Sequence, residues 1–291
     1  MFDIIDSAKN AIDAYSASLR ITSSNIANAG TSGFKGSTAH FQHIFERVMQ
    51  RGSAASPFEN IGGINPMVIG GTATLSNVAM NFSQGNLTDG GVTDMAVRTG
   101  SGMFVLTSDG GRTREFTRSG NFTFDTNGNL VTQTGLQVLG FRGSVDAAGN
   151  FTRTGDLEAI TFQGTGRDTG TLAWDDQNGV LRIFTRTDDG TVALEGTALA
   201  SFQIAVARVP NPSGLLQTSS TNFSVTAASG EATIPAPPAA GTVAGRRLEQ
   251  SNVDFISQTI RSLEDQRAIN SLLSMVRLSS DLISTFIQRL G

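Results

Sequence analysis

Residues 5–33 read IDSAKNAIDAYSASLRITSSNIANAGTSG and combine a helical repeat with a defined stop. Apolar or small side chains return every three or four residues, and only Thr22 breaks the pattern. Such a narrow stripe is typical of a helix that pairs with one other helix, as in a coiled coil. The run stops at residues 29–33, where we expect Gly30 to take a left-handed cap and Gly33 a second turn, next to Asn28. The stripe consists of Ile5, Ala8, Ile12, Tyr15, Leu19 and Ile26.

A second helix is predicted at the C-terminus, from residue 252 to residue 290, and at 1.5 Å per residue it would be about 58 Å long. Ser251 or Asn252 is a suitable N-cap, and Asp254 complements the helix dipole in the first turn. The apolar repeat lapses at residues 264–267, which predicts a stutter or a bend at that point. The repeat consists of Ile256, Ile260, Leu263, Ile269, Leu272, Val276, Ile283, Phe286 and Leu290, with Ser279 filling one slot.

Between the two helices the pattern changes to short strands separated by turns. Alternating apolar residues occur at Asn121–Phe124, Leu136–Phe141, Val180–Phe184 and Phe202–Val209. Glycine is abundant, at 33 residues, as expected of a chain with many turns. The segments that match hairpin turns are 125–129, 146–150, 176–179 and 188–190. Regularly spaced short strands predict an antiparallel body, sandwich- or barrel-like, so that the whole chain is mainly β with long helical termini.

These patterns divide the chain into four expected parts. The ends are assembly helices, and a connector that is part helical around residues 41–49 leads into the β-rich body. Within the body, a small outer subdomain and a Pro-rich spacer are further possibilities. The expected parts are residues 1–35, 36–64, 65–250 and 251–291, with the subdomain at 143–204 and the spacer at 234–245.

Each terminal helix exposes an aliphatic stripe but has no neighbouring segment with which to form a local hairpin. Burial of a large apolar side chain contributes about 1.5–3 kcal/mol, whereas ordering a residue costs about 1–2 kcal/mol. Because Ala and Ser fill many of the stripe positions, we expect the ends to order only when packed together and against copies of the chain. Periodicity alone leaves one alternative open, in which the helices dock on the chain's own body.

Composition argues against several other classes of protein. A net charge of −4 and a pI near 5.2 argue against nucleic-acid binding. The absence of cysteine excludes disulfides, thiolate metal sites and a cysteine nucleophile. His40 and His43 are spaced as two ligands on one helix turn, but no third ligand is evident nearby. The N-terminus does not match a secretory signal, and no apolar run reaches membrane-spanning length. We therefore expect no catalysis, cofactor, metal or membrane insertion.

Several segments, in order along the chain, resemble the axial proteins of the bacterial flagellum, the hook and rod subunits. Ser24–Asn28 followed by Thr31–Lys35 resembles their N-terminal signature, and Leu248–Asp254 resembles the entry into their last helix, which contains a pair like Gln266–Arg267. The last helix departs from the family's pattern at residues 268–273. Little matches between about 143 and 200. Further matching segments are Phe82–Gly85, Asp94–Val97, Gly102–Val105, Phe116–Phe122, Asp125–Gly140, Asn211–Leu215 and Asn222–Phe223.

This resemblance implies a structural subunit that is exported unfolded through the flagellar type III apparatus, without a cleaved signal peptide. It implies a helical tube of identical subunits with a central export channel, in the extracytoplasmic hook or basal body. Neighbouring axial, junction and cap proteins would be its partners. Gly36–Phe41, Leu136–Phe141 and Asn65–Pro66 favour the hook.

The distal rod is the alternative within the family. A β-rich surface or carbohydrate-binding module is the alternative of another class. One Trp and one Tyr equip the chain poorly for that role.

Overall fold

The computed structural model describes residues 2–44, 47–52, 65, 67–69, 72–146, 151–161, 172–175, 179–183, 200–235 and 241–290. The chain divides into two compact units. The helical unit consists of Met1–Ala27, Ser37–Met80 and Asp254–Gly291. The body unit consists of Asn28–Gly36 and Asn81–Val253. Each unit is therefore built from segments that are distant in the sequence.

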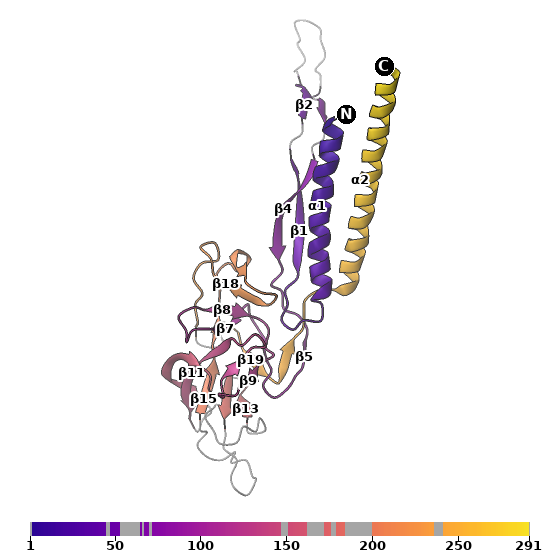
Figure 1. Cartoon of the computed structure of the whole chain (residues 1–291). Helices are drawn as coiled ribbons and strands as arrows, with labels where there is room; N and C mark the ends of the chain where they lie inside the picture. Colours follow the sequence, from indigo (N-terminus) through magenta and orange to yellow (C-terminus); the bar gives the residue numbers. More distant parts are fainter. Residues whose placement is uncertain are drawn as a thin grey trace. The chain divides into compact units, whose positions relative to one another are not determined.

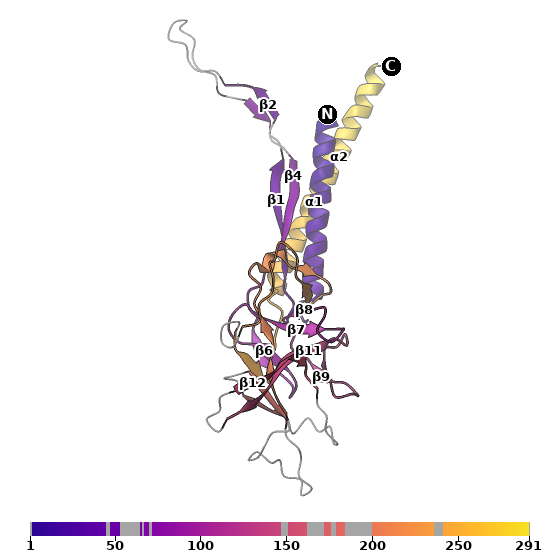
Figure 2. The ribbon, with the colours of Figure 1, turned by 90° about the vertical axis from the view of Figure 1, so that its left-hand side faces the viewer.

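The helical unit contains a helix pair and a long hairpin. Helices α1 (Phe2–Ala27) and α2 (Phe255–Leu290) pack side by side. The start of α1 and the end of α2 lie at the same end of this unit, so the pair is antiparallel (Figure 1). Strand β1 (Ser37–Ile44) pairs antiparallel with β4 (Thr72–Met80), and this hairpin packs against α1 (Figure 2). Beyond them, β2 (Arg47–Gln50) pairs with β3 (Met67–Ile69).

The hairpin corrects two predictions about the segment that follows α1. Residues 41–49 were expected to be part helical, but the described ones lie on β1 and β2, and His40 and His43 are therefore on a strand. Pairing along β4 overrides the helical pattern, because it gives β1 inter-strand backbone hydrogen bonds along its whole length from Ser37 to Ile44. Strand β4 itself was expected in the body, whereas it belongs to the helical unit.

Most strands of the body unit form one antiparallel sheet. Within the described residues, the main path of this sheet runs β13-β14-β15-β11-β7-β8-β18-β17, and β9, β10, β12 and β16 pair beside it. The path strands are β13 (Leu172–Asp175), β14 (Val180–Ile183), β15 (Ala200–Ile204), β11 (Gln137–Val145), β7 (Met103–Thr107), β8 (Glu115–Thr117), β18 (Asn222–Ser224) and β17 (Leu216–Gln217). The others are β9 (Thr123–Phe124), β10 (Leu130–Val131), β12 (Phe151–Ala159) and β16 (Val206–Ala207).

Two short strand pairs complete the body unit. Strand β6 (Met95–Val97) pairs with β19 (Val243–Gly245), and β5 (Leu87–Asp89) pairs with β20 (Arg247–Glu249). The segment that leads to α2 is thus tied to the body on both sides of Arg246. The predicted spacer at 234–245 is wrong at its end, because β19 is a paired and largely buried strand. Residues 236–240 of that spacer lie outside the described residues.

The predicted class, mainly antiparallel β with two paired terminal helices, is confirmed. In the turn at 125–129, Asp125 Oδ1 accepts hydrogen bonds from the backbone N–H groups of Asn127 and Asn129, each 2.8 Å long. Antiparallel strands flank the predicted turns at 146–150 and 176–179, most of whose residues lie outside the described part. The turn at 188–190 lies outside it altogether.

One hydrophobic core runs from β13 and β14, at one end of the sheet, to its central strands β11 and β7. Leu181 and Ile183 from β14 share this core with Phe104 from β7 and Val138 from β11. The described strands of region 143–204, the expected outer subdomain, are therefore continuous with the rest of the body. Trp174 on β13 packs against the same core, and its indole N–H donates a 2.8 Å hydrogen bond to the carbonyl oxygen of Val92.

Candidate assembly interface

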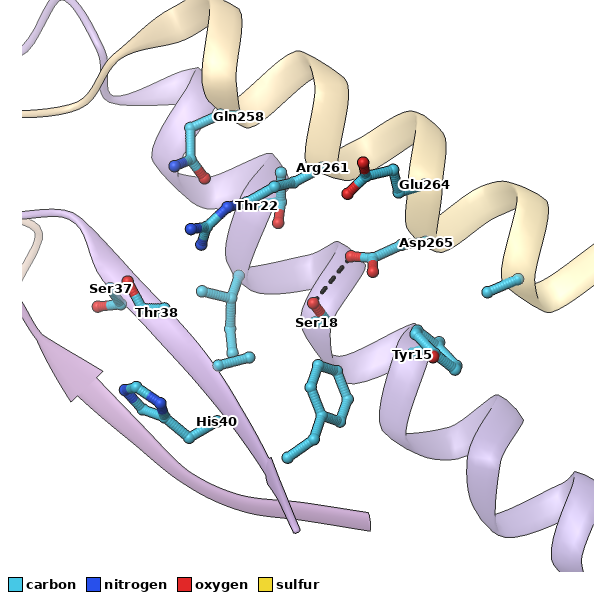
Figure 3. Close-up of a pocket in the computed structure, with 14 residues that line it drawn as sticks. Tyr15, Ser18, Thr22, Ser37, Thr38, His40, Gln258, Arg261, Glu264 and Asp265 are labelled. Atoms are coloured by element: carbon cyan, nitrogen blue, oxygen red, sulfur yellow. Dashed lines mark hydrogen bonds between the residues drawn. The ribbon is translucent and has the colours of Figure 1, made fainter. Parts of the chain in front are cut away.

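Side-chain hydrogen bonds join the described parts of α1 and α2 at two levels. Ser18 Oγ donates to Asp265 Oδ2 over 2.8 Å (Figure 3), and Asn25 Nδ2 donates to Gln258 Oε1 over 3.0 Å. Asn25 lies seven residues after Ser18, and Gln258 lies seven residues before Asp265. The two bonds therefore describe a single antiparallel register with a repeat of seven residues, as in a coiled coil.

Burial along α2 follows the same repeat. Side chains are buried or half-buried at alternating intervals of four and three residues. Asp265 and Ser279 are the most buried of them, and both are polar. Thr259 and Ala268 are also half-buried, and the repeat itself consists of Gln258, Ser262, Asp265, Ile269, Leu272, Val276, Ser279 and Ile283. We call this set the paired face of α2.

The paired face corrects the predicted stutter at residues 264–267. Helix α2 is continuous from Phe255 to Leu290, and its repeat passes through residues 264–267 without a change of phase. Ser262 and Asp265 occupy the positions at which an apolar repeat would need large side chains. A search for apolar residues therefore misses these two positions and follows Ile260 and Leu263, which lie on the other side of the helix, instead.

The predicted assembly residues fall into two groups on α2. Leu272, Val276 and Ile283 are half-buried on the paired face. Ile256, Ile260 and Leu263 are instead 69%, 52% and 50% exposed and lie on the other side of the helix. On α1, Ile5, Ile12, Leu19 and Ile26 are half-buried, whereas the side chains buried among the described residues are Ala8, Ala14, Ser18, Thr22 and Asn25.

Helix α2 also carries large apolar side chains that remain exposed in the pair with α1, and we call this set its outer apolar face. Large apolar side chains rarely gather on one exposed helix unless a partner covers them. Polar residues fill four of the eight positions of the paired face, and most of the large apolar residues of α2 lie outside it. The outer apolar face consists of Phe255, Ile256, Ile260, Leu263, Leu273, Met275, Leu278, Leu282, Phe286 and Ile287.

The register also places the last turns of α2 beyond the described part of α1. Continued by two heptads from Ser18 and Asp265, it sets Ile4 opposite Ser279. The last part of α2, from Leu282 on, then extends past the described start of α1 (Figure 1). Leu282, Phe286 and Ile287 in this extension are 56%, 58% and 64% exposed.

A cleft of about 540 Å³ lies between α1, β1 and the first half of α2 (Figure 3). Tyr15, His40, Arg261 and Glu264 line it together with Asp265. Burial raises the pKa of the Asp265 carboxyl. The hydrogen bond from Ser18 opposes this shift, nearby Glu264 adds to it, and Arg261 opposes it.

His40 is exposed, and within the described residues no group of three or more His, Asp or Glu side chains is placed to hold a metal. Neither described helix has the length and hydropathy needed to cross a membrane.

The start of α2 differs from the prediction. Asp254 provides the cap, since its carboxylate accepts hydrogen bonds from the backbone N–H groups of Ile256 (3.2 Å) and Ser257 (3.4 Å). Hydrogen bonding, chiefly from the Ser257 hydroxyl, lowers the pKa of Asp254. Asn252 is not the cap: its side chain accepts from the Gly36 N–H (2.9 Å) and donates to the carbonyl of Asn81 (2.7 Å), both within the body unit.

The turn after α1 is also partly different from the prediction. The Thr31 N–H donates to the carbonyl oxygen of Asn28 over 3.0 Å, which closes the turn. Gly30 does not take the predicted left-handed conformation, whereas Gly33 has a φ of +69°. A Cβ on Gly33 would lie 2.3 Å from the backbone nitrogen of Ser119. The special glycine is therefore Gly33, because both its φ and its close backbone contact exclude other residues.

Three buried charged residues of the described body unit contact one another, and this contact was not predicted from the sequence. Lys35 Nζ lies 2.5 Å from Glu249 Oε1, and Arg118 Nη1 lies 3.0 Å from Glu249 Oε2. Lys35 also donates to the carbonyl of Ser83, and Arg118 to the carbonyl of Gly100, each over 2.8 Å. Burial lowers the pKa of Lys35, and Glu249 opposes that shift.

Each of these three residues lies in a different segment that carried the resemblance. Lys35 ends the Thr31–Lys35 segment, Arg118 belongs to Phe116–Phe122, and Glu249 to Leu248–Asp254. The opposite charges in these three segments are the sequence signal that could have predicted the salt bridges. Together they bind the chain segments next to α1 and α2 into the body unit.

Comparison with known proteins identifies similar sequences. A family model described as the flagellar hook protein FlgE/F/G D1 domain matches residues 98–167, and one described as flagella basal body rod protein matches residues 5–35. The chain is 38% identical over 162 residues to the flagellar hook protein FlgE of Helicobacter pylori (strain ATCC 700392 / 26695), a match that covers 55% of this chain and 22% of that relative.

Rod proteins match over most of the chain. The flagellar basal-body rod protein FlgF of Caulobacter vibrioides is 30% identical over 279 residues, which covers 94% of this chain and 91% of the relative. The rod protein FlgG of Bacillus subtilis is 26% identical over 280 residues, which covers 94% of this chain and 93% of the relative.

Proposed function

Because this chain belongs to the family of flagellar hook and rod proteins, we propose that it is a hook subunit that polymerises with copies of itself into a tube. Members of this family are structural subunits of the hook and basal body, not enzymes, and they polymerise into axial structures with other flagellar components. The observation that carries the proposal is the outer apolar face of α2, which remains exposed although α1 and α2 are paired.

The contact between copies would be head to tail. The apolar extension of α2, from Leu282 on, belongs to one end of the helical unit, whereas Ile256, Ile260 and Leu263 lie near the other. Contacts between two different surfaces of identical subunits propagate as an open helix unless the rotation closes a ring. Burial of each large side chain contributes about 1.5–3 kcal/mol, which favours assembly over the free subunit.

We assign a different role in the tube to each of the two units. The helical unit would supply the contacts along the central channel, and the body unit would form the outer wall. Torque would pass through the packed helices. Neighbouring axial, junction and cap proteins would meet the same surfaces at the tube ends. Export through the flagellar type III apparatus would bring the chain to the assembly site.

A distal rod subunit is the second candidate. Identity over the matched segment favours the hook, at 38% against 26–30% for the rod proteins. Coverage favours the rod, since the rod relatives match over 91–93% of their length and the hook relative over 22%. Electron microscopy of assembled tubes distinguishes the two: curved, flexible tubes support a hook, and straight, rigid tubes support a rod.

The central test uses the extension of α2. Phe286→Asp with Ile287→Asp places two charges on exposed apolar positions, while Gln288→Asp adds a charge at an exposed polar position beside them. We expect full-length protein and the Gln288→Asp control to form tubes at high concentration and the double variant to stay monomeric. Tubes from the double variant, or none from the parent protein, would contradict assembly through this surface.

A further inference from the structure

The α1–α2 pair is held by polar contacts in a face that otherwise offers little shape to distinguish one register from another. On α1, the buried and half-buried side chains that follow Ser18 toward the N-terminus include Ala14, Ala11 and Ala8, all of them small. On α2, the corresponding apolar positions are Ile, Leu and Val. If α2 moved along α1 by one heptad, each of these alanines would contact another aliphatic side chain of similar size. Apolar packing alone therefore selects the register weakly.

The polar pairs, in contrast, fit one register only. A shift of α2 by one heptad in one direction sets Leu272 opposite Ser18, so the hydroxyl loses its carboxylate acceptor. A shift in the other direction sets the Asp265 carboxylate opposite Ala11, which has no donor. A buried polar group without a partner is costly, and single polar residues are known to fix the register of helix pairs.

Asn25 ties this register to the hairpin as well. Its side chain donates to the Ser37 carbonyl oxygen (2.7 Å) and accepts from the Ser37 N–H (3.0 Å) while it contacts Gln258. The amide is buried, and these three bonds use both of its polar atoms. Asn25 is therefore not free to follow Gln258 if α2 shifts.

We propose that the Ser18–Asp265 and Asn25–Gln258 pairs select the register of α1 and α2, and thereby set how far α2 extends past α1. This is a specificity role for polar residues within one chain. It does not depend on the proposed function, because the register is a property of the monomer.

The cysteine-free chain makes this testable with introduced cysteines in the full-length protein. In the observed register, Ala11 lies opposite Leu272, and Ala11→Cys with Leu272→Cys is the in-register reporter. Ala11→Cys with Ser279→Cys reports a shift of one heptad. Each reporter is oxidised in dilute solution, and the linked monomer is quantified on a non-reducing gel. Intramolecular products are thereby separated from linked dimers.

Each pair of reporter cysteines is introduced into three versions of the protein, which we call backgrounds. The parent background should give the in-register disulfide and little of the shifted one. Ser18→Ala, Gln258→Leu and Asp265→Leu together remove both polar pairs but leave Asn25 bound to Ser37; we expect the shifted product to rise on the order of tenfold. Ser18→Thr with Asp265→Asn keeps a hydroxyl donor and an oxygen acceptor, and should behave as the parent.

Three outcomes would overturn the proposal. In the first, the shifted product is no more abundant in the apolar background than in the parent, and in the second it is already abundant in the parent. In the third case both products disappear from the apolar background, which would mean that the polar pairs hold the helices together instead of choosing their register. The single variant Asp265→Leu, with one pair intact, should give an intermediate amount of shifted product.

Discussion

Lys35 and Glu249 form an ion pair with 2.5 Å between Nζ and Oε1, although 214 positions separate them in the sequence. Both side chains are fully buried, and Arg118 contacts the second oxygen of the same carboxylate. One carboxylate thus faces two cations inside the body unit. Lys35 follows α1 in the chain and Glu249 precedes α2, so this contact anchors both helix connections in the body.

We predict that Glu249→Gln destabilises the body unit by about 3–5 kcal/mol, because it leaves two buried cations without their counter-ion. Urea unfolding followed by the fluorescence of Trp174 measures this, since the single tryptophan packs against the body core. Glu231→Gln is the matched control, because Glu231 is exposed. Equal midpoints for Glu249→Gln and the control would show that the triad does not stabilise the body.

Two glycines in the turn after α1 should respond in opposite ways to alanine. Gly33→Ala places a Cβ 2.3 Å from the Ser119 backbone nitrogen at a φ of +69°, and should cost about 1–3 kcal/mol or more. Gly30→Ala meets no atom within 4 Å and needs no left-handed conformation. It should leave stability unchanged or raise it by about 0.4–1 kcal/mol. Urea unfolding of the two variants side by side checks this, and a larger loss for Gly30→Ala would reverse our assignment of the turn.

The helical unit should become more stable as the pH falls through the raised pKa of Asp265. Folding favours the protonated carboxyl, so the penalty is fully present above the folded pKa and is relieved as the pH falls toward the ordinary value of 3.8. Asp265→Asn removes the charge and keeps an acceptor for Ser18. We expect this variant to melt at a higher temperature than the parent at pH 7, with the difference shrinking toward pH 4.

Circular dichroism at the helical minimum follows this melting, since both described helices belong to the helical unit. The groups near Asp265 are Arg261 and Glu264 on α2, and Tyr15 and His40 across the cleft. Both proteins are compared in a His40→Gln background, so that the imidazole across the cleft does not enter the comparison. If the difference in melting temperature between Asp265→Asn and the parent were the same at pH 7 and pH 4, ionisation of Asp265 would not be its cause.

The sequence predicted the class of fold because its strongest signals are local. The strand segments around β9, β11, β14 and β15, and the Asp125 turn, follow from alternation and turn chemistry. The strand β1 was missed because its partner β4 is distant, and only that pairing decides between helix and strand. Local patterns carry no information about such long-range contacts.

The candidate interface was predicted in part, for a related reason. Leu272, Val276 and Ile283 were assigned to the correct repeat because they are apolar. Ser18, Thr22, Asn25 and Asp265 were missed because an apolar search assumes that buried positions are hydrophobic. The alternating three- and four-residue spacing that continues through Ser262 and Asp265 is the signal that would have found them.

The two faces of α2 should separate folding from assembly. Val276 lies on the paired face, and Val276→Asp puts an uncompensated charge between the helices. We expect it to lose helical signal in the monomer and to form no tubes. Ile260 is 52% exposed, so Ile260→Asp should keep the monomer's circular dichroism and thermal melting but lose tube formation. Asn270→Asp adds the same charge at an exposed polar position and should assemble normally.

Trp174 fluorescence should show a folded body in all three variants, because Val276, Ile260 and Asn270 belong to the helical unit. Circular dichroism, sedimentation velocity and electron microscopy of the same samples then report helix pairing, monomer state and tubes. If Ile260→Asp assembled like Asn270→Asp, the outer apolar face near the start of α2 would not contact a neighbouring copy. The contacts between subunits would then have to come from the extension beyond Asp281 or from the body unit.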